Sequence, residues 1–130
     1  MIYLDTSAAA KLIMADAESV ALTTFLAEHI AVPLVSSALL YPELVRAATR
    51  HQPEQIGRVM ALTQRVMTVP LASDIVTGAA TIGGPMVRTL DALHLATAKA
   101  IAEGLRAFVT YDRRQADAAA SEGLPVTVPA

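Results

Sequence analysis

The opening stretch MIYLDTSA, residues 1–8, indicates a strand that passes directly into a helix. Ile2 to Leu4 are apolar residues with β preference, and Asp5 follows them at once. Thr6 or Ser7 is expected to cap the helix that comes next. A strand followed immediately by a helix is the repeating unit of folds with a parallel sheet.

The same alternation of strand and helix continues along the chain. Further strands are predicted at residues 31–35, 67–71, 107–111 and 125–128. Helices are predicted at residues 8–14, 16–29, 36–50, 55–67, 73–82, 90–103 and 113–122, with Asp16 as the cap of the second. Pro42 leaves two alternatives for the third helix: a later start with Pro42 in the first turn, or a longer helix kinked at Pro42.

This pattern predicts an α/β fold, a three-layer α/β/α sandwich with a mostly parallel central sheet. The 130 residues contain no linker, repeat or low-complexity tract, so we expect a single domain over residues 1–130. The chain is 54% hydrophobic and only 17% charged. That excess of apolar residues predicts either a well-filled interior or a surface that another chain covers.

The composition also excludes several kinds of site. Cysteine is absent, which rules out disulfides, thiolate metal sites and cysteine nucleophiles. The first residues lack the basic start and long apolar stretch of a signal peptide, and no apolar run is long enough to cross a membrane. We therefore expect a cytoplasmic protein with no membrane contact. The formal net charge of −2 is unusual for a nucleic-acid-binding protein, which is more often basic.

Four of the 12 acidic residues fall where a parallel sheet places its ligand site, beyond the carboxyl ends of the strands. Asp5 follows the first strand, and Asp112 follows the strand predicted at 107–111. Asp91 opens the helix before that strand, and Glu43 lies in the helix after the second strand. Asp91 and Glu43 are also embedded in apolar sequence, where lone carboxylates are costly unless they are paired or bound to a metal.

Each acid has a purely structural explanation as well. Asp112 could cap a helix, and Asp91 could complement a helix dipole. Asp5 could be a turn residue, and Glu43 could pair with Arg46. Brought together, however, four carboxylates would raise one another's pKa unless a divalent cation neutralises them. Mg²⁺ and Mn²⁺ prefer oxygen ligands and can activate water against a phosphoryl group, so the four acids predict a Mg²⁺- or Mn²⁺-dependent site for phosphodiester hydrolysis.

Four segments of the chain, in this order and at these separations, resemble the PIN-domain ribonucleases. They are LDTSA, YPELVRA, LDALHLATA and VTYDRR. Within that family, the chain is most similar to the VapC-type toxins of prokaryotic toxin–antitoxin pairs, and the resemblance covers essentially its full length. It implies a metal-dependent endoribonuclease that cleaves RNA, forms a homodimer and is held inactive by a small antitoxin protein.

The resemblance also implies roles for individual residues. The family's acidic catalytic and metal-binding positions match Asp5, Glu43, Asp91 and Asp112. Hydroxyl positions that often line the site match Thr6, Ser7 and Thr110.

Basic residues near the acids are candidates for binding RNA phosphates. They are Arg46, Arg50, Arg113 and Arg114, for which ordinary solvated arginine is an equal alternative. His94 lies one helical turn after Asp91, where a buried supporting residue is more common than a general base. Asp117 could be an additional ligand, but a surface role is an equal alternative at its helical position, and it is left out of the site.

Two other α/β classes with acids at strand ends lack residues that they require here, whereas two further functions stay as alternatives. A receiver domain would need an acid pair after the first strand and a lysine after a late strand, but Lys11 and Lys99 lie in predicted helices. A haloacid-dehalogenase phosphatase would need Asp-x-Asp, and the residue two after Asp5 is Ser7. A PIN-like module that binds RNA or protein without catalysis, or a housekeeping RNA-processing nuclease, is compatible with the same sequence.

Overall fold

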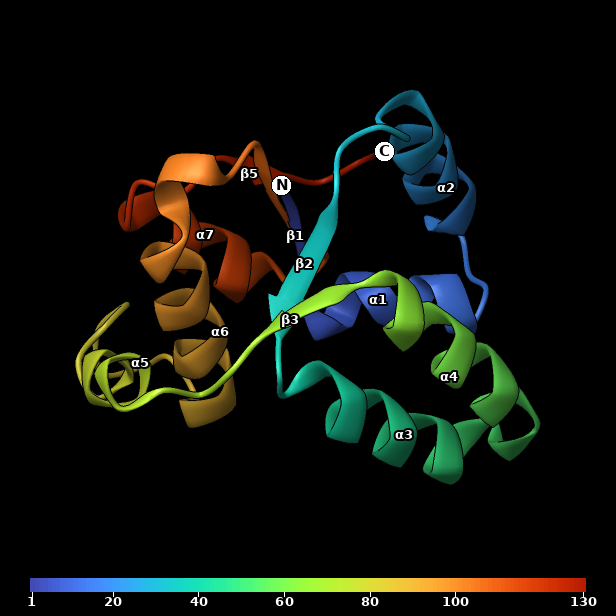
Figure 1. The fold of residues 1–130 in the computed structure, drawn as a ribbon, viewed down its shortest axis with the longest axis horizontal. Helices are drawn as coiled ribbons and strands as arrows, with labels where there is room; N and C mark the ends of the chain where they lie inside the picture. The colour runs from blue at the N-terminus through green and yellow to red at the C-terminus, as the bar shows by residue number, and fades with distance from the viewer.

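The protein forms a five-stranded sheet covered by helices on both faces (Figure 1), in a computed structural model that describes all 130 residues. The strands are β1 (Ile2–Leu4), β2 (Leu34–Ser37), β3 (Met67–Val69), β4 (Ala107–Val109) and β5 (Val126–Thr127). The helices are α1 (Thr6–Ile13), α2 (Ser19–Glu28), α3 (Leu40–His51), α4 (Ile56–Arg65), α5 (Ser73–Ala79), α6 (Thr89–Ala100) and α7 (Arg113–Ser121), with short 3-10 helices η1 (Pro53–Gln55) and η2 (Ala102–Gly104).

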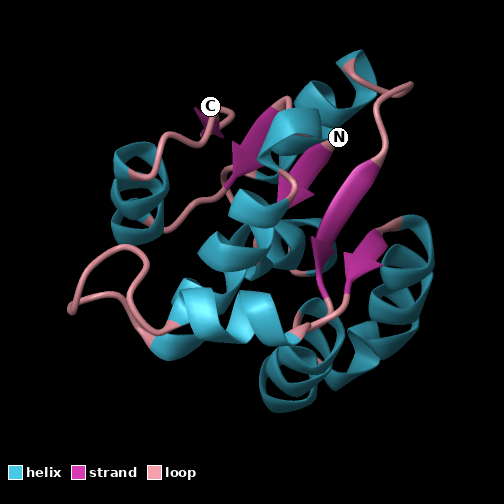
Figure 2. Cartoon of the chain, turned by 60° about the vertical axis from the view of Figure 1, so that its left-hand side comes forward, coloured by secondary structure: helices cyan, strands magenta, loops and turns pink.

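The sheet has the order β3-β2-β1-β4-β5, and every neighbouring pair is parallel (Figure 2). Helices α5, α6 and α7 lie on one side of the sheet, and α1 to α4 lie on the other (Figure 1). The predicted three-layer α/β/α sandwich with a parallel sheet is therefore confirmed. None of the helices is long and apolar enough to cross a bilayer.

Strand β1 lies at the centre of the sheet and shows how the core is divided. Its three residues are fully buried, and their side chains alternate between the two faces. Tyr3 points towards α6 and α7 and stacks on Phe108 of β4, with 5.1 Å between ring centroids. Ile2 and Leu4 pack on the other face, in a cluster that includes Leu22 of α2. Burial on both faces explains why the central strands read as short apolar runs.

The beginning of α1 differs from the prediction. Asp5 is the N-cap, because its Oδ1 accepts a hydrogen bond from the Ala8 amide at 3.0 Å, and the helix already begins at Thr6. Thr6 and Ser7 were therefore wrongly expected as caps. Asp16 is likewise not the cap of α2; it binds the Glu18 amide in the preceding loop, and the helix begins at Ser19.

Strand β2 and helix α3 both start later than predicted. Residues 34–37 pair with β1 and β3, so the predicted strand at 31–35 was placed about three residues too early. Helix α3 consequently begins at Leu40, and Pro42 lies in its first turn, where its missing amide proton costs no helical hydrogen bond. This resolves the two alternatives in favour of a later start. Glu43 lies in the same first turn of α3, directly after Pro42.

The turn before α6 depends on glycine. Gly83 has φ of 73°, in the left-handed region, and a Cβ there would meet Val87 Cγ2 at 2.9 Å. This turn ends the segment after α5 and delivers the chain to Thr89, the first residue of α6. The position of Asp91 is therefore set by a turn that other residues would strain.

Candidate metal centre

The carboxyl ends of β1 and β4 place two acids next to each other. Leu4 and Val109 are register partners, and the Asp5 amide donates to the Val109 carbonyl at 3.1 Å. Asp112 follows three residues after Val109. Because both strands end at the same edge, the predicted clustering at the carboxyl edge of the sheet rests directly on their parallel pairing.

Asp5 is held rigidly in the interior. Its side chain is only 4% exposed, and Oδ1 accepts from Ser7 Oγ at 2.6 Å while Oδ2 accepts from Thr110 Oγ1 at 2.6 Å. Burial raises the pKa of the Asp5 carboxyl, and the hydrogen bonds from Ser7 and Thr110 oppose that rise. The carboxylate is thus fixed in one orientation by the two hydroxyl residues beside it.

The same two hydroxyls also shape the loop that carries Asp112. Ser7 Oγ accepts from the Tyr111 amide at 2.9 Å, and Thr110 Oγ1 accepts from the Asp112 amide at 3.1 Å. Ser7 Oγ and Thr110 Oγ1 lie 3.2 Å apart. They therefore fix Asp5 relative to Asp112, which gives a physical reason for hydroxyl residues at these positions.

Glu43 enters the site from α3 and does not pair with Arg46. Its Oε1 accepts from Thr6 Oγ1 at 2.8 Å and lies 2.7 Å from His94 Nε2. On its other side, His94 Nδ1 lies 2.7 Å from the hydroxyl of Tyr3, whose pKa is raised far above its ordinary value by burial. The alternative role of Glu43, a pair with Arg46, is therefore wrong, and Glu43 contacts the partly buried Thr6 and the buried His94 instead.

Asp91 shows that the four acids share one electrostatic environment. Burial raises the pKa of its carboxyl, and the negative charges of Asp112, Asp5 and Glu43 raise it further. None of the three aspartates forms an ion pair, because the salt bridges of the protein are Lys11 with Asp16, Lys11 with Glu18, and His94 with Glu43. The cluster therefore carries negative charge with no lysine or arginine against it.

Asp112 caps helix α7, which was the structural alternative to a metal-binding role. Its Oδ1 accepts from the amides of Arg114 at 2.9 Å and Gln115 at 3.2 Å, and so caps α7. The side chain is exposed, and Oδ2 has no hydrogen-bond partner within the protein. Capping by one oxygen leaves the other available to a ligand.

The donor set fits a divalent cation of the Mg²⁺ or Mn²⁺ kind. All four groups offer carboxylate oxygens, which these ions prefer, and no lysine or arginine pairs with Asp91 to offset the repulsion there. As the side chains stand, no three of the acidic and histidine residues are arranged to hold a metal ion. The carboxylates share one edge of the sheet but do not form a coordination site as they stand, so metal binding would require some of these side chains to change conformation.

The four candidate arginines lie in the solvated layer around the site. Arg46 and Arg50 are exposed on α3, and Arg113 and Arg114 are exposed at the start of α7. None of them makes an ion pair. Arg46 and Arg50 lie on the helix that carries Glu43, and Arg113 and Arg114 lie next to the cap Asp112.

Two buried polar residues of this region escaped the sequence analysis. Tyr3 was read only as part of a strand, although its hydroxyl reaches His94. Gln115 is 2% exposed; its Nε2 donates to the Asp91 carbonyl at 3.1 Å, and its Oε1 has no partner. The sequence feature that could have identified Gln115 is its position three residues after Asp112, on the alanine-rich face of α7.

Residues 2–121 match the family described as the PIN domain. Because the match covers most of its length, the chain belongs to the PIN-domain family. It is 39% identical over 131 residues to "Ribonuclease VapC35" of Mycobacterium tuberculosis, across 99% of this chain and 97% of that one. It is 40% identical over 117 residues to "Ribonuclease VapC47" of the same organism, across 88% and 86% of the two chains. Within the PIN-domain family, it is therefore a VapC-type protein.

Solved structures agree with this fold. The crystal structure of Mycobacterium tuberculosis VapC20, described as a sarcin-ricin loop cleaving toxin, has a TM-score of 0.77 at 17% identity and covers 99% of this chain and 100% of its own. VapBC2 from Rickettsia felis, solved bound to a promoter DNA fragment, has a TM-score of 0.77 at 14% identity, with both chains fully covered. At such low identity, the agreement concerns the fold.

Proposed function

We propose that this protein is a Mg²⁺- or Mn²⁺-dependent endoribonuclease and the toxin of a type II toxin–antitoxin pair. The observation that carries the proposal is the convergence of Asp5, Glu43, Asp91 and Asp112 at one edge of the sheet, without a lysine or arginine partner. The identity of 39% to a protein named a ribonuclease supports RNA as the substrate.

The four acids would hold the cation, and the hydroxyls of Thr6, Ser7 and Thr110 would keep them in place. When bound, the metal would supply an activated water and stabilise charge on the phosphoryl oxygens. Ser7 and Thr110 donate to the two oxygens of Asp5, which opposes the rise in its pKa that burial causes and favours its ionised form. The direct test is cleavage of RNA by the purified protein with Mg²⁺ or Mn²⁺, compared with the same reaction in excess chelator.

The substitution Asp91→Asn is expected to stabilise the metal-free protein and to weaken its stabilisation by Mn²⁺. The raised pKa of Asp91 means that its ionised form destabilises the metal-free fold, and this cost grows as the pH rises through the folded pKa. The metal-free variant should therefore melt at a higher temperature than the wild type at pH 7, and this gain should shrink in acid. Wild type in Mn²⁺ at about 100 times Kd should gain about 2.7 kcal/mol, and the variant much less.

Thermal melts with and without Mn²⁺ at two pH values measure both effects. Asp117→Asn is the matched control, because Asp117 is an exposed aspartate of α7 outside the cluster. If Asp91→Asn lowered the metal-free melting temperature at pH 7, the proposed repulsion between the carboxylates would be wrong.

RNA binding by the exposed arginines should depend on salt. The logarithm of the affinity for single-stranded RNA falls with the logarithm of the salt concentration by about 0.7 for each phosphate contact. Four arginine contacts would give a slope of about −3. The Arg113→Ala/Arg114→Ala variant should reduce the slope to about half, with Mn²⁺ binding unchanged. A slope unaffected by this change would place the RNA on another surface.

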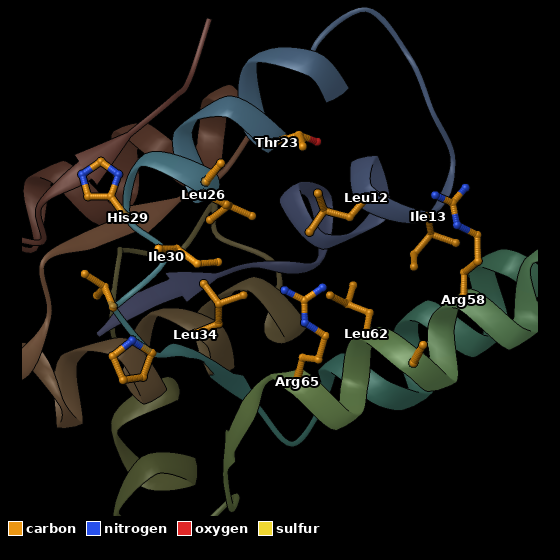
Figure 3. A pocket seen from close by; sticks show the side chains of 14 residues that line it. Leu12, Ile13, Thr23, Leu26, His29, Ile30, Leu34, Arg58, Leu62 and Arg65 are labelled. Carbon is orange, nitrogen blue, oxygen red and sulfur yellow. The ribbon is translucent and has the colours of Figure 1, made fainter.

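The antitoxin would bind in an apolar groove between α2 and α4 (Figure 3). The groove has a volume of about 560 Å³ and also takes in the end of α1 and the approach to β2. Leu26 and Leu62 face it from its two walls, and the side chains of Arg58 and Arg65 extend from α4 and line it as well (Figure 3). No acidic residue lines it. An amphipathic segment that carries both apolar and acidic side chains would complement this surface.

The groove lies away from the carboxylates, since none of the four acids lines it. A basic residue of the antitoxin that reaches the acids would therefore belong to a part of the antitoxin that extends beyond the groove.

The homodimer implied by the family stays a prediction. Val76, Met86 and Leu90 are exposed apolar residues of α5, the turn before α6, and α6, and they offer a face for a second copy.

A further inference from the structure

A continuous line of hydrogen bonds connects the centre of the core to the candidate metal centre. The Tyr3 hydroxyl on β1 lies 2.7 Å from His94 Nδ1, and His94 Nε2 on α6 lies 2.7 Å from Glu43 Oε1 on α3. Tyr3 is fully buried and His94 is 2% exposed, whereas the side chain of Glu43 is 22% exposed. The line thus runs from the interior to the open edge of the sheet.

The protons along this line can be assigned from the chemistry of its members. An ionised carboxylate accepts only, so His94 Nε2 must carry the proton that faces Glu43. Tyr3 is a protonated phenol with one proton to give. Its other hydroxyl neighbours, Ser36 and Thr97, donate their own protons to the backbone carbonyls of Leu4 and Leu93. We take Tyr3 as the donor to Nδ1, which assigns His94 the tautomer protonated on Nε2.

We propose that Tyr3 and His94 are a positioning pair that holds the Glu43 carboxylate in one orientation for the divalent cation. The proposal rests on the proposed function, in which Glu43 is a metal ligand. His94 and Thr6 both approach Oε1, so the side chain is fixed through one oxygen, while Oε2 has no partner within the protein. Glutamate has several rotatable bonds, and this fixation removes the entropy cost of ordering it when the metal binds.

In this tautomer, His94 does not act as a general base. Its Nδ1 is engaged by Tyr3 and its Nε2 carries a proton, so neither nitrogen offers a lone pair to a water molecule. Asp91 and His94 are also three residues apart on α6, on adjacent positions of one helical face. Helix α6 thereby supplies one proposed ligand directly and orients a second one through its histidine.

Substitutions at His94 test the pair through Mn²⁺ affinity, measured by calorimetry on the folded protein. His94→Leu keeps a side chain of similar size but removes the donor, and it should weaken Mn²⁺ binding about 10- to 100-fold, as loss of hydrogen bonds to metal ligands usually does. In His94→Gln, the amide group can take the place of Nε2–H and should restore most of the affinity. Equal losses in both variants, or wild-type affinity in His94→Leu, would overturn the proposal.

A second measurement does not depend on the metal. The ¹H–¹⁵N spectrum of the metal-free wild type should show His94 protonated on Nε2 alone, with Nδ1 accepting a hydrogen bond, and Tyr3→Phe should change the Nδ1 chemical shift because it removes that bond. Proton occupancy of Nδ1 in the wild type would overturn the pair. If the wild type bound no Mn²⁺ at all, the proposed function would fail, and the tautomer spectrum would still decide whether Tyr3 and His94 act together on Glu43.

Discussion

Asp5→Asn is expected to abolish RNA cleavage, with a loss on the order of 1,000-fold or more. Metal stabilisation of the transition state contributes several kcal/mol, and each 1.36 kcal/mol corresponds to a factor of ten in rate. Asparagine is as good an N-cap as aspartate, so α1 should remain intact. The change therefore removes the charge of Asp5 while it preserves the local fold.

Single-turnover cleavage of RNA in Mn²⁺ measures this effect, with circular dichroism to verify folding. Asp117→Asn again serves as the control and should cleave at the wild-type rate. Activity of Asp5→Asn within a few-fold of wild type would show that the buried carboxylate is only a cap, and the metal centre would have to be assigned to other residues.

Expression of the wild-type protein alone is expected to arrest growth, and co-expression of its small partner should restore it. Asp5→Asn should not arrest growth under the same conditions, because arrest would come from RNA cleavage. Harmless expression of protein that is active in vitro, together with the absence of any co-purifying small protein, would contradict the toxin assignment and favour a housekeeping nuclease.

The groove gives this experiment a sharper form. Arg58→Glu should still arrest growth, since the groove contains none of the four acids, but its partner should bind at least about tenfold more weakly and fail to rescue. Arg106→Glu, a charge reversal at an exposed arginine outside the groove, is the matched control and should be rescued normally. Equal rescue of both variants would move the partner to another face.

Patterns local to the sequence predicted the fold well. Asp5 and Asp112 could be placed at one edge because each comes within three residues of the end of an apolar strand, and parallel strands end together. The extent of β2 was harder, since its pairing with β1 and β3 is a contact between distant residues. The residues before it are apolar too, so composition alone could not fix where the strand begins.

The partners of the acids were predicted less well. Glu43 has Arg46 one turn away, yet it contacts His94, which is 51 residues further along the chain. A local rule favours the neighbour on the same helix, whereas the packing of α3 against the sheet edge decides the actual partner. The link from Tyr3 to Glu43 through His94 joins three elements and has no signature in any one of them.

The repulsion at Asp91 has a consequence for how cells escape such a toxin. Selection against growth arrest favours any substitution that stops cleavage, and neutral residues at Asp91 would do so while they make the metal-free fold more robust. The groove between α2 and α4 would be untouched in these variants. An escaped copy would then persist as an inert decoy, sequester the partner protein, and leave any intact copy in the same cell less restrained.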